Sequence, residues 1–204
     1  MGRTKSDALR IIRNCAISYR DNLENKNVLF VSTADNKAET FEVSFLPRNF
    51  LHLTGIITKH NSTTFYSLTL RGRLREQDIS FADDGTTEMK LDVLDSLMKI
   101  HLTAKMLGDY NHSQSLLVTD KLAGTVTSAL GFKKDDKYYL PNTSLKTDIR
   151  TVSQKPVKRI VATFVKRFDD PLYCEMSYLA KGFTIEDELL LSAIQGTVDL
   201  DKIV

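Results

Sequence analysis

The stretch NVLFVSTADNKAETFEVSFL, residues 27–46, decides what kind of sheet this chain builds. Its first half, Val28 to Thr33, is rich in apolar and β-branched residues, which is typical of a strand. In ETFEVSFL, apolar and polar residues alternate, so their side chains point to opposite faces. The apolar face consists of Phe41, Val43 and Phe45, and the polar face of Glu42 and Ser44. DNKA between the two runs is a turn signal, so the stretch predicts an antiparallel hairpin with one face toward a core.

The rest of the chain alternates irregularly between helical and strand-like patterns. Helical spacing of apolar residues, with Ser6 or Asp7 as the first cap, predicts helices over residues 7–22, 61–72, 85–107 and 184–195, and a helical turn over 143–153. Further strands are predicted over residues 49–56, 78–83, 115–120, 127–134, 137–142, 157–168 and 172–182. The strands do not alternate regularly with crossover helices, which disfavours a parallel sheet. We therefore predict an α+β fold: an N-terminal helix and a mostly antiparallel sheet with interspersed helices.

Length and composition fit one soluble globular domain. The 204 residues are 42% hydrophobic and 26% charged, with a formal net charge of +2. We expect a single domain over residues 1–204, with a core from about 8 to 182 and the C-terminal helix after it. No run resembles a signal peptide or a membrane span, so a cytoplasmic protein without a membrane partner is expected.

Several kinds of site are disfavoured by the motifs. The two cysteines, Cys15 and Cys174, lie far apart and outside any metal-ligand pattern, so neither a zinc site nor a disulfide framework is indicated. The glycine-rich phosphate-binding signatures of dinucleotide and P-loop proteins do not occur. We expect no cofactor and no metal.

The segment NFLHLTGI, residues 49–56, places one histidine inside an apolar run. Taken as a strand, it puts His52 and Thr54 on one face, roughly 6.5 to 7 Å apart, with Gly55 behind them. An imidazole and a hydroxyl at that separation suit one phosphate group. The alternative is a half-buried histidine that is hydrogen-bonded to a neighbour, and the pattern alone leaves both open.

A second candidate is KYYLPNTSLKTDIR, residues 137–150. Here Tyr139 ends a predicted strand, and Asn142 or Thr143 begins a helical turn whose free N–H groups suit an anion. Lys146 and Arg150 are four residues apart and would share one helical face. The stretch is equally consistent with a solvated helix.

Local clusters of cations form a third set of candidates. Arg71 and Arg73 belong to RGRLR, and Lys166 lies within VKRIVATFVKRF. Such clusters are usually solvated surfaces, but they also suit a polyanion backbone.

Several phrases of the sequence resemble a known family. They are RNFLHLTGI, DDGTTEMKLDVLDSLM, AKMLGDYN, TDKLAG, LGF and YYLPNTSLKTDIR. Over about residues 8–182 the chain resembles the phage-associated nuclease-like domains grouped with barnase, EndoU, the tRNA-cleaving colicins and RelE, in their fourth subfamily. The resemblance implies an α+β domain on bacterial mobile elements, with a site on the open face of its sheet and metal-independent RNA cleavage. The resemblance places His52 with Thr54, the stretch from Tyr139 to Arg150, and Lys166 with Tyr178 in its strongest-matching segments.

Chemistry assigns trial roles to these residues in a metal-independent endoribonuclease. His52 would be the base or the acid, and Thr54 would hold a phosphate oxygen. The groups expected to stabilise the developing charge are Lys146, Arg150 and Lys166, with Tyr139 as a stacking platform or acid partner. Substrate-binding roles are assigned to Arg71, Arg73 and Tyr178.

The sequence leaves two other functions open. One is a non-catalytic RNA-binding or toxin-like interaction module, and the other is an enzyme that acts on a nucleotide or protein substrate. RNA is the expected partner, and an antitoxin or immunity protein is expected if expression proves toxic.

Overall fold

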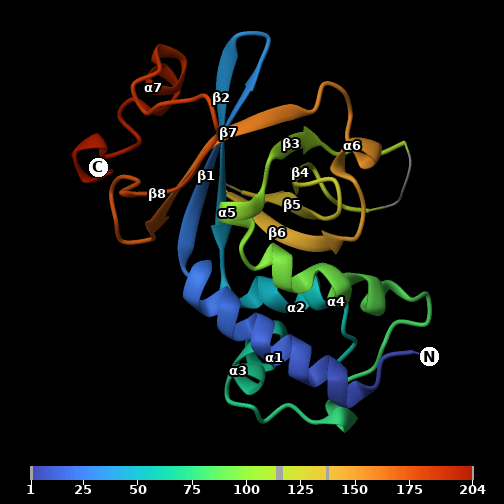
Figure 1. The fold of residues 1–204 in the computed structure, drawn as a ribbon. Coiled ribbons are helices and arrows are strands. Elements are labelled where there is room, and N and C mark those ends of the chain that lie inside the picture. The colour runs from blue at the N-terminus through green and yellow to red at the C-terminus, as the bar shows by residue number, and fades with distance from the viewer. Residues whose placement is uncertain (1, 114–116, 137, 204) are drawn as a thin grey trace.

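A computed structural model gives the fold and describes residues 2–113, 117–136 and 138–203 (Figure 1). The helices in this part of the chain are α1 (Lys5–Asn22), α2 (Phe50–Thr54), α3 (Ser62–Leu70), α4 (Thr86–Leu97), α5 (Ile100–Thr103), α6 (Ile149–Val152) and α7 (Glu188–Ile194), with short 3-10 helices η1 (Pro47–Asn49), η2 (Glu76–Asp78) and η3 (Leu200–Lys202). The strands are β1 (Lys26–Ala34), β2 (Lys37–Phe45), β3 (Met106–Asp109), β4 (Lys121–Gly124), β5 (Ala129–Asp135), β6 (Tyr138–Leu145), β7 (Lys158–Arg167) and β8 (Glu175–Leu179). None of the described helices combines the length and apolar character needed to cross a bilayer.

The predicted hairpin is confirmed as β1 and β2. Asp35 and Asn36 adopt positive φ angles of 51° and 59°, which a two-residue hairpin turn requires. Ala34 pairs with Lys37, and the register then places Asn27 opposite Ser44. The polar side of the hairpin therefore faces away from the main core.

The sheet closes on itself. β1 pairs with both β2 and β7, and the order β1-β2-β6-β5-β4-β3-β7 returns to β1. Among the described strands, β8 stands outside this ring as an extension of β7. Between these strands, the pairing of β2 with β6 is the one parallel contact and consists of a single register pair, Val43 with Tyr139. The fold is α+β with a mostly antiparallel sheet, as predicted.

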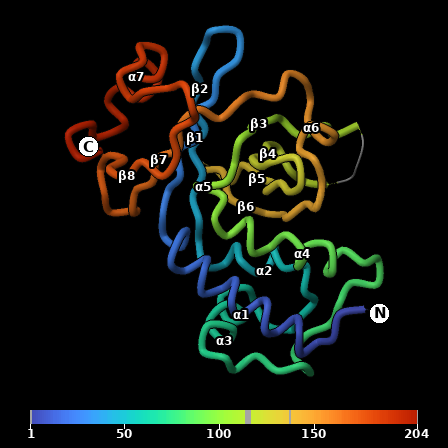
Figure 2. Tube along the Cα trace, viewed as in Figure 1, coloured from blue at the N-terminus to red at the C-terminus, as the bar shows by residue number. Residues whose placement is uncertain are grey.

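Two cores lie on opposite sides of β1 and β7. Inside the ring, apolar residues such as Phe30, Phe45 and Phe132 pack together with buried residues of α1 to α4. Figures 1 and 2 show these helices grouped at one end of the molecule, below the strands. Outside the ring, Leu29 and Phe164 pack against the segment that carries α7. This segment covers only part of the outer face, and the uncovered part forms the pocket described below.

The strand predicted over residues 49–56 is wrong, because this segment forms η1 and α2. Phe50, Leu53 and Thr54 are buried, and their spacing of three and four residues is that of a helix. Pro47 lies at the start of the helical segment and Gly55 ends it with a φ of 67°. These start and stop signals override the apolar alternation on which the strand prediction rests.

Other predicted boundaries also need correction. The helix over 85–107 ends at Leu97. The helical turn over 143–153 begins later than predicted, because β6 continues to Leu145, and it is confirmed as α6, Ile149–Val152. Pro141 sits in β6 beside a bulge, where a missing N–H is tolerated. The segment 78–83 makes only an isolated bridge from Ser80 to Ile57.

The remaining differences are at the ends of elements. The first helix is capped by Thr4, and α7 begins four residues later than predicted, at Glu188. The predicted strand over 115–120 falls partly on residues 115 and 116, which lie outside the described residues, and residues 117–120 are not in a strand.

Candidate functional site

The uncovered part of the outer face contains a pocket of about 320 Å³. Strands β1, β2 and β6 supply its floor, and η1 and the residue after β7 supply its edges. The lining residues are Asn27, Ser44, Leu46, Arg48, Asp135, Tyr138, Leu140 and Phe168. We call this the outer-face pocket.

A chain of hydrogen bonds runs from the floor of the pocket. The Ser44 hydroxyl donates to the Asn27 Oδ1 at 2.7 Å, and the Asn27 amide donates to the Glu42 Oε1 at 3.2 Å. The Tyr173 hydroxyl donates to the same Glu42 oxygen at 2.7 Å. Glu42 itself is exposed, so its carboxylate is held in place while it remains open to solvent.

Tyr173 is a permanent hydrogen-bond donor to Glu42 in this network. Its side chain is fully buried, and burial, together with the hydrogen bond to Glu42, raises its pKa well above the usual value for tyrosine. The phenol therefore keeps its proton at neutral pH and orients the carboxylate. Glu42 is the acceptor of this arrangement through its Oε1 atom, and its other carboxylate oxygen accepts no hydrogen bond from the described residues.

Lys166 is adjacent to the same network. It pairs across the sheet with Asn27, so the two side chains point to the same outer face. Its ammonium lies 5.0 Å from the centre of the Tyr173 ring and donates to the carbonyl oxygen of Pro171 at 3.3 Å. The Lys166 ammonium and the Glu42 carboxylate thus contact the same tyrosine, and the described residues show no ion pair between the two charges.

Two exposed aromatic rings and an arginine border the pocket. Tyr138 is 51% exposed and Phe168 is 40% exposed, which is unusual for rings of this size. Arg48 lies in η1, and its guanidinium is 3.4 Å from the Asp135 carboxylate. Exposed rings beside cations are the combination with which proteins stack bases and hold phosphates of single-stranded RNA.

His52 lies near this pocket rather than in it. η1 continues directly into α2, so His52 comes one helical turn after Arg48 on an exposed face. The Nζ of Lys90 donates to the carbonyl oxygen of His52 at 2.9 Å. Of the residues predicted to act in chemistry, none lines the pocket itself, but Lys166 pairs with the lining residue Asn27, and His52 follows the lining residue Arg48 by one helical turn.

Thr54 does not share a surface with His52, so their predicted pairing is wrong. Its side chain is fully buried. The hydroxyl donates to the carbonyl oxygen of Leu51 at 2.8 Å and accepts from the N–H of Ile56 at 3.1 Å. These bonds fix the end of α2 and leave the hydroxyl no access to a phosphate.

Replacing Thr54 with Val is expected to lower the free energy of unfolding by about 1–3 kcal/mol, because a buried N–H is left without its acceptor. Urea unfolding measures the change. The control is Thr63→Val, at an exposed position of α3, where a change within about 0.5 kcal/mol is expected. Equal effects of the two substitutions would contradict the structural role of Thr54.

Lys146 and Arg150 are already paired with carboxylates. Lys146 lies 2.7 Å from Asp92, a residue of α4, and Arg150 lies 2.5 Å from Asp148. They are on no common helix, because Lys146 follows β6 directly and Arg150 belongs to α6. The predicted anion site at a helix start beginning at residue 142 or 143 is therefore wrong. Asp148, a few residues further on, caps α6 instead.

The other predicted residues occupy separate places. Tyr139 is half-buried and packs edge-on against Phe41, with ring centres 4.8 Å apart. Tyr178 lies in β8 beneath the ammonium of Lys105, which is 3.4 Å above the ring centre. Arg71 and Arg73 follow α3. Within the described residues, no hydrogen bond, ion pair or ring contact joins any two of the predicted site residues.

The residues that sequence reasoning misses are those of the hydrogen-bonded network. The strand pattern identifies Glu42 and Ser44 as a polar face, and the two-residue turn alone places Asn27 opposite Ser44. The hairpin pattern is therefore sufficient to bring Asn27, Glu42 and Ser44 together. It does not predict the hydrogen bond from Tyr173, which is 131 residues away from Glu42 in sequence.

Comparison with known proteins adds a family to this geometry. Residues 11–182 match the family described as phage-Barnase-EndoU-ColicinE5/D-RelE like nuclease 4. The chain belongs to this nuclease-like family. No curated protein and no solved structure gives a significant match. The matched range contains every residue of the outer-face pocket and its network and ends before α7, so membership of the family covers the candidate site.

Proposed function

We propose that this member of the nuclease family is a metal-independent endoribonuclease and that it cleaves RNA at the outer-face pocket. The observation that carries the proposal is the Glu42 carboxylate, exposed but held by Tyr173 and Asn27, with the Lys166 ammonium over the ring of the same Tyr173. RNA cleavage without a metal requires a base for the 2′-OH, an acid for the leaving 5′-oxygen, and cations around the phosphate. Arg48 in the pocket lining, and Glu42, Lys166 and His52 in the network and helix next to it, have suitable chemistry for these requirements.

In the proposed reaction, Glu42 takes the proton of the 2′-OH. The 2′-oxygen attacks the adjacent phosphorus and forms a 2′,3′-cyclic phosphate, and the bond to the 5′-oxygen breaks. His52 is the proposed donor of the proton that the leaving 5′-oxygen needs. Lys166 and Arg48 stabilise the charge on the non-bridging oxygens, and the rings of Tyr138 and Phe168 stack on the bases that flank the scissile bond.

The test is incubation of matched RNA and DNA strands with the protein in an excess of chelator. Cleavage of RNA and not of DNA is expected, because only RNA carries the 2′-OH nucleophile. Intact RNA that is nevertheless bound would support a non-catalytic RNA-binding module instead. Turnover of mononucleotides without cleavage of RNA would support a nucleotide-specific enzyme.

A ribonuclease that is toxic to its host requires a partner protein that inhibits it. If expression of the protein halts growth of a bacterial host, we expect a dedicated antitoxin or immunity protein that covers the outer-face pocket. Arg48 and the exposed aromatic rings of Tyr138 and Phe168 are residue types that dominate the energetics of protein interfaces.

A further inference from the structure

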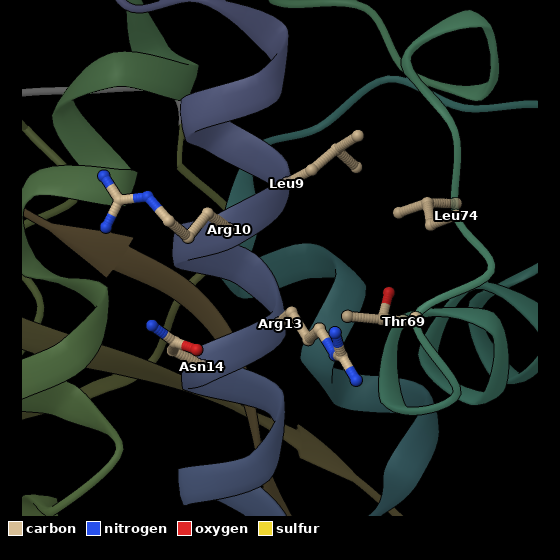
Figure 3. A pocket seen from close by; sticks show the side chains of 7 residues that line it. Leu9, Arg10, Arg13, Asn14, Thr69 and Leu74 are labelled. Carbon is tan, nitrogen blue, oxygen red and sulfur yellow. The ribbon is translucent and has the colours of Figure 1, made fainter.

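A second concave surface lies between α1 and the segment that follows α3. It encloses about 290 Å³ and is shown in Figure 3. Arg13 projects from α1 toward Thr69, whereas Arg10 and Asn14 point to the other side of α1 (Figure 3). Leu9 and Leu74 supply apolar contacts, and Gly72 is also part of the lining. We call this surface the arginine groove.

The charges of this groove are only partly neutralised by the protein itself. Arg10 forms an ion pair with Asp7 at 3.5 Å. Arg13, and Arg71 and Arg73 on either side of the lining residue Gly72, form no ion pair with any described carboxylate. Arg3, Arg20, Arg48 and Arg150 form ion pairs, whereas Arg75, Arg159 and Arg167 form none with a described carboxylate. The groove differs from these other positions because its unpaired guanidinium, that of Arg13, lines a concave surface next to Gly72.

Backbone geometry holds one guanidinium in the groove. Gly72 has a φ of +64°, and a Cβ atom at this position would lie 2.9 Å from the Cζ of Arg13. The Arg13 side chain therefore packs directly on the backbone of Gly72, the residue that lies between Arg71 and Arg73 in the sequence. A guanidinium held in this way offers paired N–H donors, which match the oxygens of a phosphate.

We propose that the arginine groove binds backbone phosphates of the RNA strand, outside the pocket where cleavage occurs. This inference rests on the proposed function, because it takes RNA as the substrate. Arg48 borders the outer-face pocket from η1, and η1 packs against α3, whose last turn leads to Arg71. A strand that leaves the pocket over Arg48 can follow α3 to the groove.

The test measures binding of 2′-O-methyl RNA, which lacks the nucleophile, as a dinucleotide and as a much longer strand. The variants are Arg13→Ala, Arg71→Ala and Arg73→Ala combined, and the same three positions changed to Lys. For the wild type, we expect tighter binding of the long strand and a steep dependence on salt. In the Ala variant the affinity for the long strand should fall at least about tenfold, and the salt slope should decrease by about 0.7 for each phosphate that the groove no longer binds.

Matched controls separate charge from folding. The Lys variant keeps the charges and should retain most of the affinity for the long strand. Arg159→Ala removes an arginine that stacks on Phe183 in another region, and it should leave the affinity for RNA unchanged. Thermal unfolding should be the same for all variants, because the substituted side chains are exposed.

Three outcomes would overturn the inference. If the Ala variant binds the long strand as tightly as the wild type, the groove does not contact RNA and the proposed function is unaffected. If it instead loses binding of poly-glutamate while it keeps its affinity for RNA, the groove docks an acidic protein. If the wild type binds no RNA of either length, the proposed function fails together with the inference.

Discussion

Replacing Glu42 with Gln is expected to reduce the rate of RNA cleavage in a single turnover by about 10²–10⁴-fold, the range typical of general-base catalysis. The amide has the same shape, and its oxygen still accepts from Tyr173 and Asn27, so the network remains in place. The amide cannot, however, take a proton from the 2′-OH. The reduction should therefore appear in the rate of the chemical step, with RNA affinity nearly unchanged.

The matched control for this variant is Glu39→Gln. Glu39 lies three residues earlier in β2 and pairs with Lys158, away from the outer-face pocket. Its substitution should leave the cleavage rate within a few-fold of the wild type. Equal reductions in the two variants would show that the effect comes from the strand as a whole and not from the carboxylate at position 42.

The second large effect concerns stability. Replacing Phe132 with Ala is expected to lower the free energy of unfolding by about 3–5 kcal/mol. Phe132 is fully buried in β5 and makes edge contacts with Phe41 and Phe45 of β2, with ring centres 5.5 and 6.3 Å apart. Since β2 and β6 share one register pair, side-chain packing holds this side of the ring closed.

Urea unfolding and thermal unfolding measure this decrease in stability. For a chain of this size, each kcal/mol corresponds to a decrease of about 2–4 °C in Tm. Phe168→Ala, at a ring that is 40% exposed, is the control and should change the stability by no more than about 0.5 kcal/mol. If Phe132→Ala were equally mild, the sheet would be held closed by contacts other than the aromatic cluster.

Local patterns are sufficient for part of this fold. The hairpin of β1 and β2 follows from alternation and from an Asp-Asn turn, and α1 and α3 follow from helical spacing and caps. The helix α2 is within reach of the same reasoning, because Pro47 and Gly55 are helix start and stop signals. The apolar run between them is ambiguous between helix and strand, as short apolar runs are.

Other elements depend on distant partners. β3 and β4 have only four residues each. They form strands because they pair with each other and because β3 also pairs with β7 and β4 with β5. The closure of the sheet likewise depends on β1 pairing with β7, more than 120 residues away in sequence. No local pattern contains this information.

The candidate site likewise combines residues that local patterns predict with a residue that only the folded chain brings to them. The polar face of Glu42 and Ser44, and the cation at Lys166, are readable in the sequence, whereas Tyr173 joins them only in the folded chain. A strand assignment places Thr54 on the same surface as His52. Because the segment is a helix, the Thr54 side chain instead points into the core. The sequence thus identifies chemistry-bearing residue types more reliably than the faces on which they lie.

The most direct test of the central claim uses a DNA strand that contains one ribonucleotide. We predict cleavage only on the 3′ side of that ribonucleotide, in the presence of chelator, with a 2′,3′-cyclic phosphate on the upstream product. This result requires attack by the neighbouring 2′-OH. Cleavage at deoxyribonucleotides, or products that end in a 3′-hydroxyl, would contradict the account.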